Sequence, residues 1–311
     1  MTYALSVLSL QGRPVPAIEV GGGYWNLQHF LPQFVTRPET GLLGVLERWD
    51  EAREQLLALA RMLEQAPAGA TGQIDAAPEE MPFLLLSHPR KIICAGMNYY
   101  DHLRDDMGVL DFAKESTDPL FFLKQSGSLV PSGTTIPFPS QTKQLDWEVE
   151  LVVIFGRKGQ RIKAADVDDY IAGYTTGLDL SARDWQFNPR HPRQFDLMTG
   201  KAFDGSAPIG PKMVPAHAVD PTELLIRLWV NGAIKQDSHT REMIWSIGEL
   251  VEYFSLHCAI EPGDLLFTGS PAGVGWASGT FLNQSDVVEA EIGGLGHLRI
   301  DFGPSIDSRG A

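Results

Sequence analysis

The chain has 311 residues, of which 43% are hydrophobic and 21% charged, the composition of an ordinary folded protein with room for one large domain and an appendage, or for two domains. The formal net charge of −14, from 25 basic and 39 acidic residues, argues against nucleic acid or an anionic membrane as the main partner. With only two cysteines, the chain cannot have a disulfide framework. Its N-terminus lacks a signal-peptide pattern and it has no run of about 20 apolar residues, so we expect a cytoplasmic protein that does not enter a membrane.

The first 80 residues are predicted to form a small α/β module followed by a linker. Residues 3–10 and 16–20 have the composition of short strands, next to turns at QGRP and GGG. From Leu42 to about Leu63, apolar residues at helical spacing predict one helix, and the segment APAGATGQ ends it.

Residues 81–311 are predicted to form a second, mainly β domain, so the fold class is α+β. Short β-type runs separated by glycine and proline turns indicate its strands: KIICAG, ELVVIFG, LLIRLWVNG, DLLFTG, VVEAEIGG and GHLRIDFG.

The run DWEVELVVIFG places two acids in a strand that is apolar on both faces. Side chains alternate along a strand, so Glu148 and Glu150 point the same way, and Asp146 can follow them. Such acids stay wet on a solvated face, share a proton or hold a cation, because two buried carboxylates repel each other. The apolar residues VVIFG that follow favour burial, and therefore a metal or acid/base site.

Two further segments carry polar side chains beside apolar strands. In GMNYYDHLRDDM, His102 precedes Asp105 by three residues, which gives an acid–imidazole pair if the segment is helical, although any surface helix can show this spacing. In GYTTGLDLSARDWQ, Asp179 lies between two leucines, and Arg183 either clamps a carboxylate or forms a structural ion pair.

Lys201 lies in GKAFDGSAPIGP, and the glycine-rich turn PGDLLFTGSPAGVG has the spacing of neither common nucleotide-binding loop, which argues against a nucleotide. Carboxylates without cysteine or histidine clusters favour Mg²⁺ or Mn²⁺, with Ca²⁺ as the alternative.

Taken in order, these segments resemble the fumarylacetoacetate hydrolase family, specifically its bacterial acylpyruvase and catechol-pathway branch. Seven motifs carry the resemblance, which covers about Pro82 to Phe302: KIICAGMNYYDH, PLFFLK, LDWEVELVVIFG, GYTTGLDLSARDWQ, GKAFDGSAPIGP, VNGAIKQDSHTREMIW and PGDLLFTGSPAGVG. The family fold implied is a mixed β-roll or β-sandwich with short helices, usually a homodimer.

The resemblance also implies roles for individual residues. Glu148, Glu150 and Asp179 would hold the divalent cation. His102 would be the general base, with Asp105 at the position of its usual acidic partner and Asp106 or a distant glutamate as alternatives. Lys201 would stabilise an enolate, and the remaining substrate contacts would come from Lys124, Arg183, Gln186 and Ser270, the last of which replaces a common threonine.

The activity that the resemblance implies is metal-dependent hydrolysis of a C–C bond in an acylpyruvate-type 2,4-dioxo acid, such as fumarylpyruvate or another intermediate of aromatic catabolism. The alternatives are decarboxylation of an oxaloacetate-type acid, and isomerisation or hydration of an unsaturated 2-oxo dicarboxylate. A hypothesis from another class is a metal-dependent protein that binds oxo acids without turnover.

Overall fold

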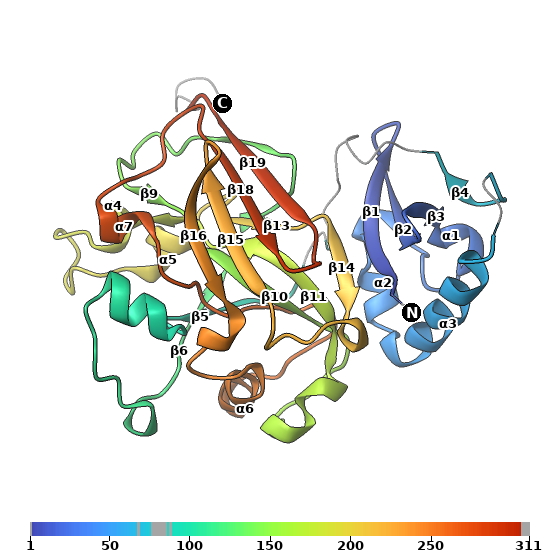
Figure 1. Ribbon diagram of the computed structural model, residues 1–311, viewed down its shortest axis with the longest axis horizontal. Coiled ribbons are helices and arrows are strands. Elements are labelled where there is room, and N and C mark those ends of the chain that lie inside the picture. The colour runs from blue at the N-terminus through green and yellow to red at the C-terminus, as the bar shows by residue number, and fades with distance from the viewer. Residues whose placement is uncertain (1, 67–68, 76–85, 87–88, 306–311) are drawn as a thin grey trace.

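The computed structural model describes residues 2–66, 69–75, 86 and 89–305, and its fold is α+β with mainly β structure (Figure 1). The predicted fold class is therefore confirmed. The predicted boundary between residues 80 and 81 lies outside the described residues, and the division into two domains stays a prediction. No helix in the described part of the chain is long and apolar enough to cross a membrane.

The N-terminal part contains an antiparallel meander and three α-helices. Its elements are β1 (Ala4–Leu10), β2 (Arg13–Val20), β3 (Gly23–Asn26), α1 (Leu27–Phe30), the 3₁₀ turn η1 (Pro38–Thr40), α2 (Leu43–Leu46), α3 (Trp49–Leu63) and β4 (Gln73–Ile74). The strands expected over residues 3–20 are confirmed, with Gln11 and Gly12 at positive φ in the turn between them.

The single helix predicted from Leu42 to about Leu63 is wrong, because Arg48 interrupts it between α2 and α3. The backbone of Arg48 is not helical (φ −125°, ψ 36°). Its guanidinium donates to the carbonyl of Gln33 and lies 4.7 Å from the ring centroid of Phe34. These tertiary contacts bend the chain where the apolar spacing continues, so the spacing alone does not reveal the break.

The rest of the chain contributes strands to a large sheet and to a second sheet. The large sheet takes β5 (Ile92–Gly96), β6 (Leu120–Lys124), β7 (Leu129–Pro131), β10 (Val149–Phe155), β11 (Ile171–Leu178), β13 (Ala207–Ile209), β14 (Lys212–Pro215) and β17 (Leu265–Phe267). The second sheet has the order β16 (Ala233–His239), β15 (Leu225–Val230), β18 (Val287–Ile292), β19 (His297–Gly303) and β8 (Thr135–Pro137), and β9 (Leu145–Asp146) pairs with β12 (Ser181–Ala182).

The helices of this part are short. They are α4 (Arg183–Gln186), α5 (Leu197–Lys201), α6 (Ile247–His257) and α7 (Gly275–Ser278), together with the π-helix η2 (His102–Asp106) and the 3₁₀ turns η3 (Lys114–Ser116), η4 (Ser126–Ser128), η5 (Ala164–Asp169), η6 (Ala216–Ala218) and η7 (Thr240–Glu242).

The large sheet continues without interruption from the N-terminal part into the body. Its main path within the described residues is β4-β3-β2-β1-β14-β11-β10-β17-β5-β6. Leu5 of β1 pairs with Met213 of β14, and Figure 1 shows the N-terminal elements in blue at one end of the molecule, with β14 beside them.

Strand β10 is buried on both faces because a different core covers each face. Leu151 and Val153 pack in the core that includes the second sheet and α6, whereas Val152 and Ile154 pack in the core that includes the N-terminal elements. Because side chains alternate along a strand, Glu150 lies on the same face as Val152 and Ile154, near the start of β10.

Candidate metal centre

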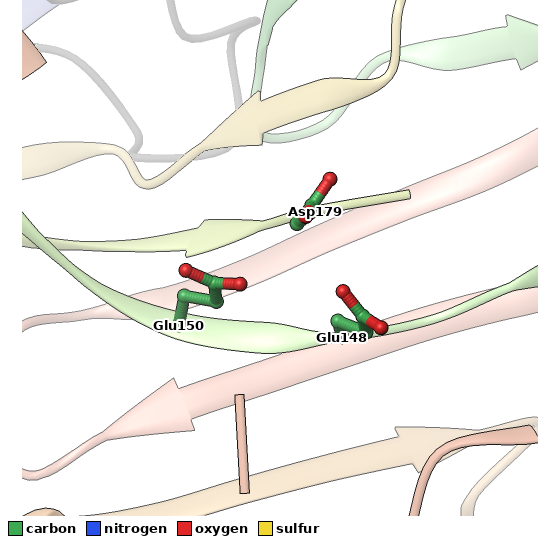
Figure 2. Close-up of side chains that lie close together, drawn as sticks. All are labelled: Glu148, Glu150 and Asp179. Atoms are coloured by element: carbon green, nitrogen blue, oxygen red, sulfur yellow. The ribbon is translucent and has the colours of Figure 1, made fainter. Parts of the chain in front are cut away.

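Three carboxylates converge where β10 begins and β11 ends. The two strands are antiparallel, with Glu150 opposite Gly177, and the Asp179 N–H donates to the Glu148 carbonyl at 2.8 Å. One carboxylate oxygen from each of Glu148, Glu150 and Asp179 lies within 4.8 Å of the other two (Figure 2). Glu148 is 6% exposed and Glu150 2% exposed, so the interpretation as a solvated strand face is wrong.

Cationic side chains surround this triad of acids. Lys201 Nζ lies 2.5 Å from Glu148 Oε2 and 2.7 Å from Asp179 Oδ2. Lys124 Nζ lies 2.7 Å from Asp179 Oδ1, and Arg183 binds both Glu148 and Asp146, the latter through Nε at 2.9 Å. Arg183 therefore clamps Glu148 of the triad together with Asp146.

The acids of the triad have opposite electrostatic environments. Burial raises the pKa of Glu148, but the positive charges of Arg183 and Lys201 outweigh it and bring that pKa below its usual range. Burial, followed by the negative charges of Asp179 and Glu148, raises the pKa of Glu150 well above its ordinary value. Glu150 is thus the acid of the triad that most lacks a positive partner.

The charges of the centre leave room for a divalent cation. Asp146, Glu148, Glu150 and Asp179 supply four negative charges, and Lys124, Arg183 and Lys201 supply three positive charges, which leaves a net charge of −1 when all are ionised. Asp179 Oδ1 is buried and, despite the nearby lysine, accepts no hydrogen bond from the described residues. Three clustered carboxylates in a centre with a net negative charge suit a hard cation such as Mg²⁺ or Mn²⁺.

The acid beside His102 is Asp106. His102 Nδ1 lies 2.6 Å from Asp106 Oδ2, and Asp106 also accepts hydrogen bonds from the Gly273 and Val274 N–H groups. Asp105 instead pairs with Arg104 at the surface, at 2.7 Å, so the expected pairing of His102 with Asp105 does not form. The reason is the π-helix, whose wider turn brings residue i+4 under residue i and rotates residue i+3 away.

One cavity of about 240 Å³ joins the acids to the imidazole. Its lining holds most of the residues singled out in the sequence: His102, Glu148, Glu150, Asp179, Arg183, Gln186, Lys201 and Ser270. Gln186 accepts from Arg183 at 3.2 Å, and Ser270 donates to the Val149 carbonyl at 3.1 Å. Their expected roles as substrate contacts stay predictions.

Lys124 does not line this cavity, contrary to its expected place in the pocket. Its ammonium is buried behind Asp179, where it donates to the carbonyls of Leu180, Lys201 and Ser206 and to the Ser206 hydroxyl. With its donors satisfied in this way, Lys124 neutralises Asp179 from the side opposite the cavity.

Two buried residues that the sequence did not single out as site residues support the centre. Asp146 accepts from Arg183 and from the N–H groups of Trp147, Gly275 and Trp276, so it is saturated and holds α7. Gln236 of β16 accepts from the Val149 N–H at 3.0 Å and donates to the Ser270 hydroxyl at 2.9 Å. Gln236 comes from the second sheet, and its surface-like segment KQDSH gave no signal for burial.

A buried triad of carboxylates, an arginine that clamps one of them and a His–Asp pair lie around one cavity, an arrangement that can hold a divalent cation. The family model "Fumarylacetoacetate (FAA) hydrolase C-terminal" matches residues 91–302. The chain therefore belongs to the fumarylacetoacetate hydrolase family, as the sequence motifs predicted.

Individual relatives differ in the reaction that their names state. The chain is 38% identical over 282 residues, 89% of this chain and 83% of the relative, to "Oxaloacetate tautomerase Fahd2a, mitochondrial" of Rattus norvegicus. A fumarylpyruvate hydrolase from Pseudomonas aeruginosa, solved with Mn²⁺ and pyruvate, is 35% identical with a TM-score of 0.62, over 75% of this chain and 94% of that one. The fumarylacetoacetate hydrolase of Exiguobacterium antarcticum has a TM-score of 0.80 at 27% identity, over 97% of this chain and 99% of that one.

Proposed function

We propose that this protein is a divalent-metal-dependent enzyme that transfers a proton at C3 of a 2-oxo acid and so interconverts its keto and enol forms. The observation that carries this proposal is the His102–Asp106 pair on the cavity that also holds the three acids. A base facing a cation site is the minimum that enolisation of a 2-oxo acid requires.

Glu148, Glu150 and Asp179 would hold Mg²⁺ or Mn²⁺, with Ca²⁺ as the alternative, and the bound cation would act as a Lewis acid toward the substrate carboxylate and 2-oxo group. With Nδ1 on Asp106, His102 offers Nε2 to the proton at C3. The C–H bond breaks, its electron pair becomes the enolate, and the imidazolium returns the proton to the 2-oxygen. Lys201 contributes a fixed positive charge beside the developing enolate.

One observation supports tautomerisation ahead of the hydrolysis favoured by the motifs. The similarity to the rat oxaloacetate tautomerase extends over 89% of this chain.

Hydrolysis of an acylpyruvate is the second candidate, supported by the similarity to the fumarylpyruvate hydrolase solved with pyruvate. It would use the same residues, with His102 taking a proton from water instead of from C3. Decarboxylation, hydration, and a place in aromatic catabolism stay alternatives within the same class of substrate.

The test is an assay of enol loss from freshly dissolved enol-oxaloacetate by ultraviolet absorbance, with Mg²⁺, with Mn²⁺ and with EDTA. We expect metal-dependent acceleration, and a 10²- to 10⁴-fold loss in His102→Ala. Pyruvate release from acylpyruvates without enol–keto acceleration would assign the chain to the hydrolases instead. Tight oxo-acid binding without any turnover would support the binding-protein hypothesis.

Two further properties are proposed, the oligomeric state and the location in the cell. A homodimer rests on the family resemblance, and sedimentation of the purified protein tests it. A cytoplasmic location rests on the sequence alone, while the rat relative is named mitochondrial, and fractionation of the source cells distinguishes the two.

A further inference from the structure

The outer wall of the cavity is aromatic. Phe187, Phe195 and Trp276 all line it, and they are 46%, 43% and 43% exposed. The Phe187 ring stacks against Trp276 at a centroid distance of 6.1 Å and contacts Phe195 at 5.4 Å. Large apolar side chains exposed together around a cavity are typical of a surface that binds a ligand.

This aromatic wall is attached to the charged centre by backbone hydrogen bonds. The Phe187 N–H donates to the carbonyl of Arg183 at 2.8 Å, and the Trp276 N–H donates to Asp146 at 3.0 Å. The segment that carries Phe195 is closed by the Asp196 N–H, which donates to the Gln186 carbonyl at 2.8 Å. The backbone that carries the wall is therefore hydrogen-bonded to the elements that hold the acids.

The aromatic wall offers no free positive charge. Among the described residues that line the cavity, the cationic or protonatable ones are His102, Arg183 and Lys201, and each is paired with an acid. Arg190 and Arg193, in the segment between Phe187 and Phe195, are exposed and do not line it. If the substrate had a second carboxylate at the end remote from the metal triad, that group would lose hydration against the aromatic rings without gaining a positive partner.

We propose that the substrate is a 2-oxo monocarboxylic acid whose group beyond C3 is uncharged and apolar, such as an aryl ring, and that this group packs on Phe187, Phe195 and Trp276. The inference rests on the proposed function, because it takes the acid end of the substrate to lie at the metal triad.

The test compares phenylpyruvate with oxaloacetate, two enolisable 2-oxo acids that differ in the apolar or charged group on C3. With the Mn²⁺-loaded protein, we expect kcat/KM for tautomerisation to be at least about tenfold higher for phenylpyruvate, since burying an aromatic ring contributes about 10- to 100-fold. Calorimetric titration of each acid gives a second readout, in which phenylpyruvate binds more tightly.

The variants Phe187→Ala and Phe195→Ala should lower the phenylpyruvate-to-oxaloacetate ratio by roughly tenfold. Leu256→Ala, which removes an exposed apolar side chain of α6 outside the cavity, is the matched control and should leave the ratio unchanged. Thermal unfolding of each variant checks that it is folded, and having two wall variants keeps the test valid if one does not fold.

Equal or higher efficiency and affinity for oxaloacetate would overturn the inference while leaving the proposed function intact. Tighter binding of phenylpyruvate with no tautomerisation of either acid would support the inference about the wall and refute the proposed reaction. Wall variants that leave the ratio unchanged would also refute the inference.

Discussion

The ammonium group of Lys201 lies 2.5 Å from Oε2 of Glu148, so it occupies an oxygen of an acid that also belongs to the metal triad. Lys201 and a divalent cation therefore share the negative charge of the same acids. Burial lowers the pKa of Lys201, but Asp179 and Glu148 outweigh burial and raise it, which keeps the ammonium charged.

Replacing Lys201 by methionine should separate metal binding from catalysis. The loss of a positive charge a few Å from the cation should raise Mn²⁺ affinity by at least about tenfold, because such charges repel by several kcal/mol at an effective dielectric constant of about 20. Turnover should fall by about 10²- to 10³-fold, as for loss of a group that stabilises an oxyanion. Mn²⁺ titration followed by calorimetry, together with enol–keto kinetics, measures both. Weaker Mn²⁺ binding would contradict this account.

Variants of the neighbouring Asp105 and Asp106 form a matched pair that tests which acid acts with the His102 imidazole. Asp106→Asn should reduce kcat by about 10²- to 10⁴-fold, because the amide no longer holds His102 in the tautomer with a free Nε2. Asp105→Asn removes a surface ion pair with Arg104 and should leave kcat within about twofold. Equal losses in both variants would mean that His102 has a different partner during turnover.

Metal stabilisation should increase with pH because of Glu150. In the unfolded state, the Glu150 carboxyl loses its proton as the pH rises above its ordinary pKa of 4.5. In the metal-free folded state its pKa is raised, so it keeps that proton to a higher pH. Glu150 therefore supports metal-free stability fully below about pH 4.5, and that contribution is lost as the pH rises toward the raised value. A bound cation favours the ionised form and reverses this loss.

Thermal unfolding at pH 5 to 8 with and without Mg²⁺ measures the effect. The Mg²⁺-induced rise in Tm should grow with pH in the parent, and Glu150→Gln should weaken that growth. A Tm shift independent of pH in the parent would refute the assignment of Glu150.

Gln236→Leu should destabilise the metal centre although Gln236 touches no proposed ligand side chain. The change leaves the buried Val149 N–H without its Gln236 acceptor, at a cost of roughly 1–3 kcal/mol for an unsatisfied group, and removes one of the two hydrogen bonds of the Ser270 hydroxyl. We expect a lower Tm and weaker Mg²⁺ binding. Leu225→Ala is the control, since the Leu225 side chain is exposed on the other face of the same sheet.

The sequence predicted the triad in two ways: strand alternation put Glu148 and Glu150 on one face, and the family resemblance supplied Asp179 as the third ligand. Alternation places Glu148 and Glu150 on one side, and the hairpin of β10 and β11 brings Asp179 opposite them. The motifs indicated the family, and the family resemblance assigned roles to His102 and Lys201 that local spacing alone does not give.

Other features depend on contacts that no local pattern reveals. The choice of Asp106 over Asp105 follows from a π-helical turn that sequence spacing treats as an ordinary helix. Gln236 reaches the centre from the other sheet, and the position of Lys124 behind Asp179 follows from carbonyls of three separate residues. These are products of tertiary packing, which decides the partners of buried polar groups.

The pairing of β1 with β14 makes the N-terminal part a support of the sheet that carries the metal triad. Without β1, the backbone of β14 would lose its partner at Leu5 and become an open sheet edge, and the face of β10 that carries Val152 and Ile154 would lose its cover. The same face carries Glu150. Residues near the start of the chain, far in sequence from the motifs that indicate the family, therefore bury the part of β10 that follows Glu150.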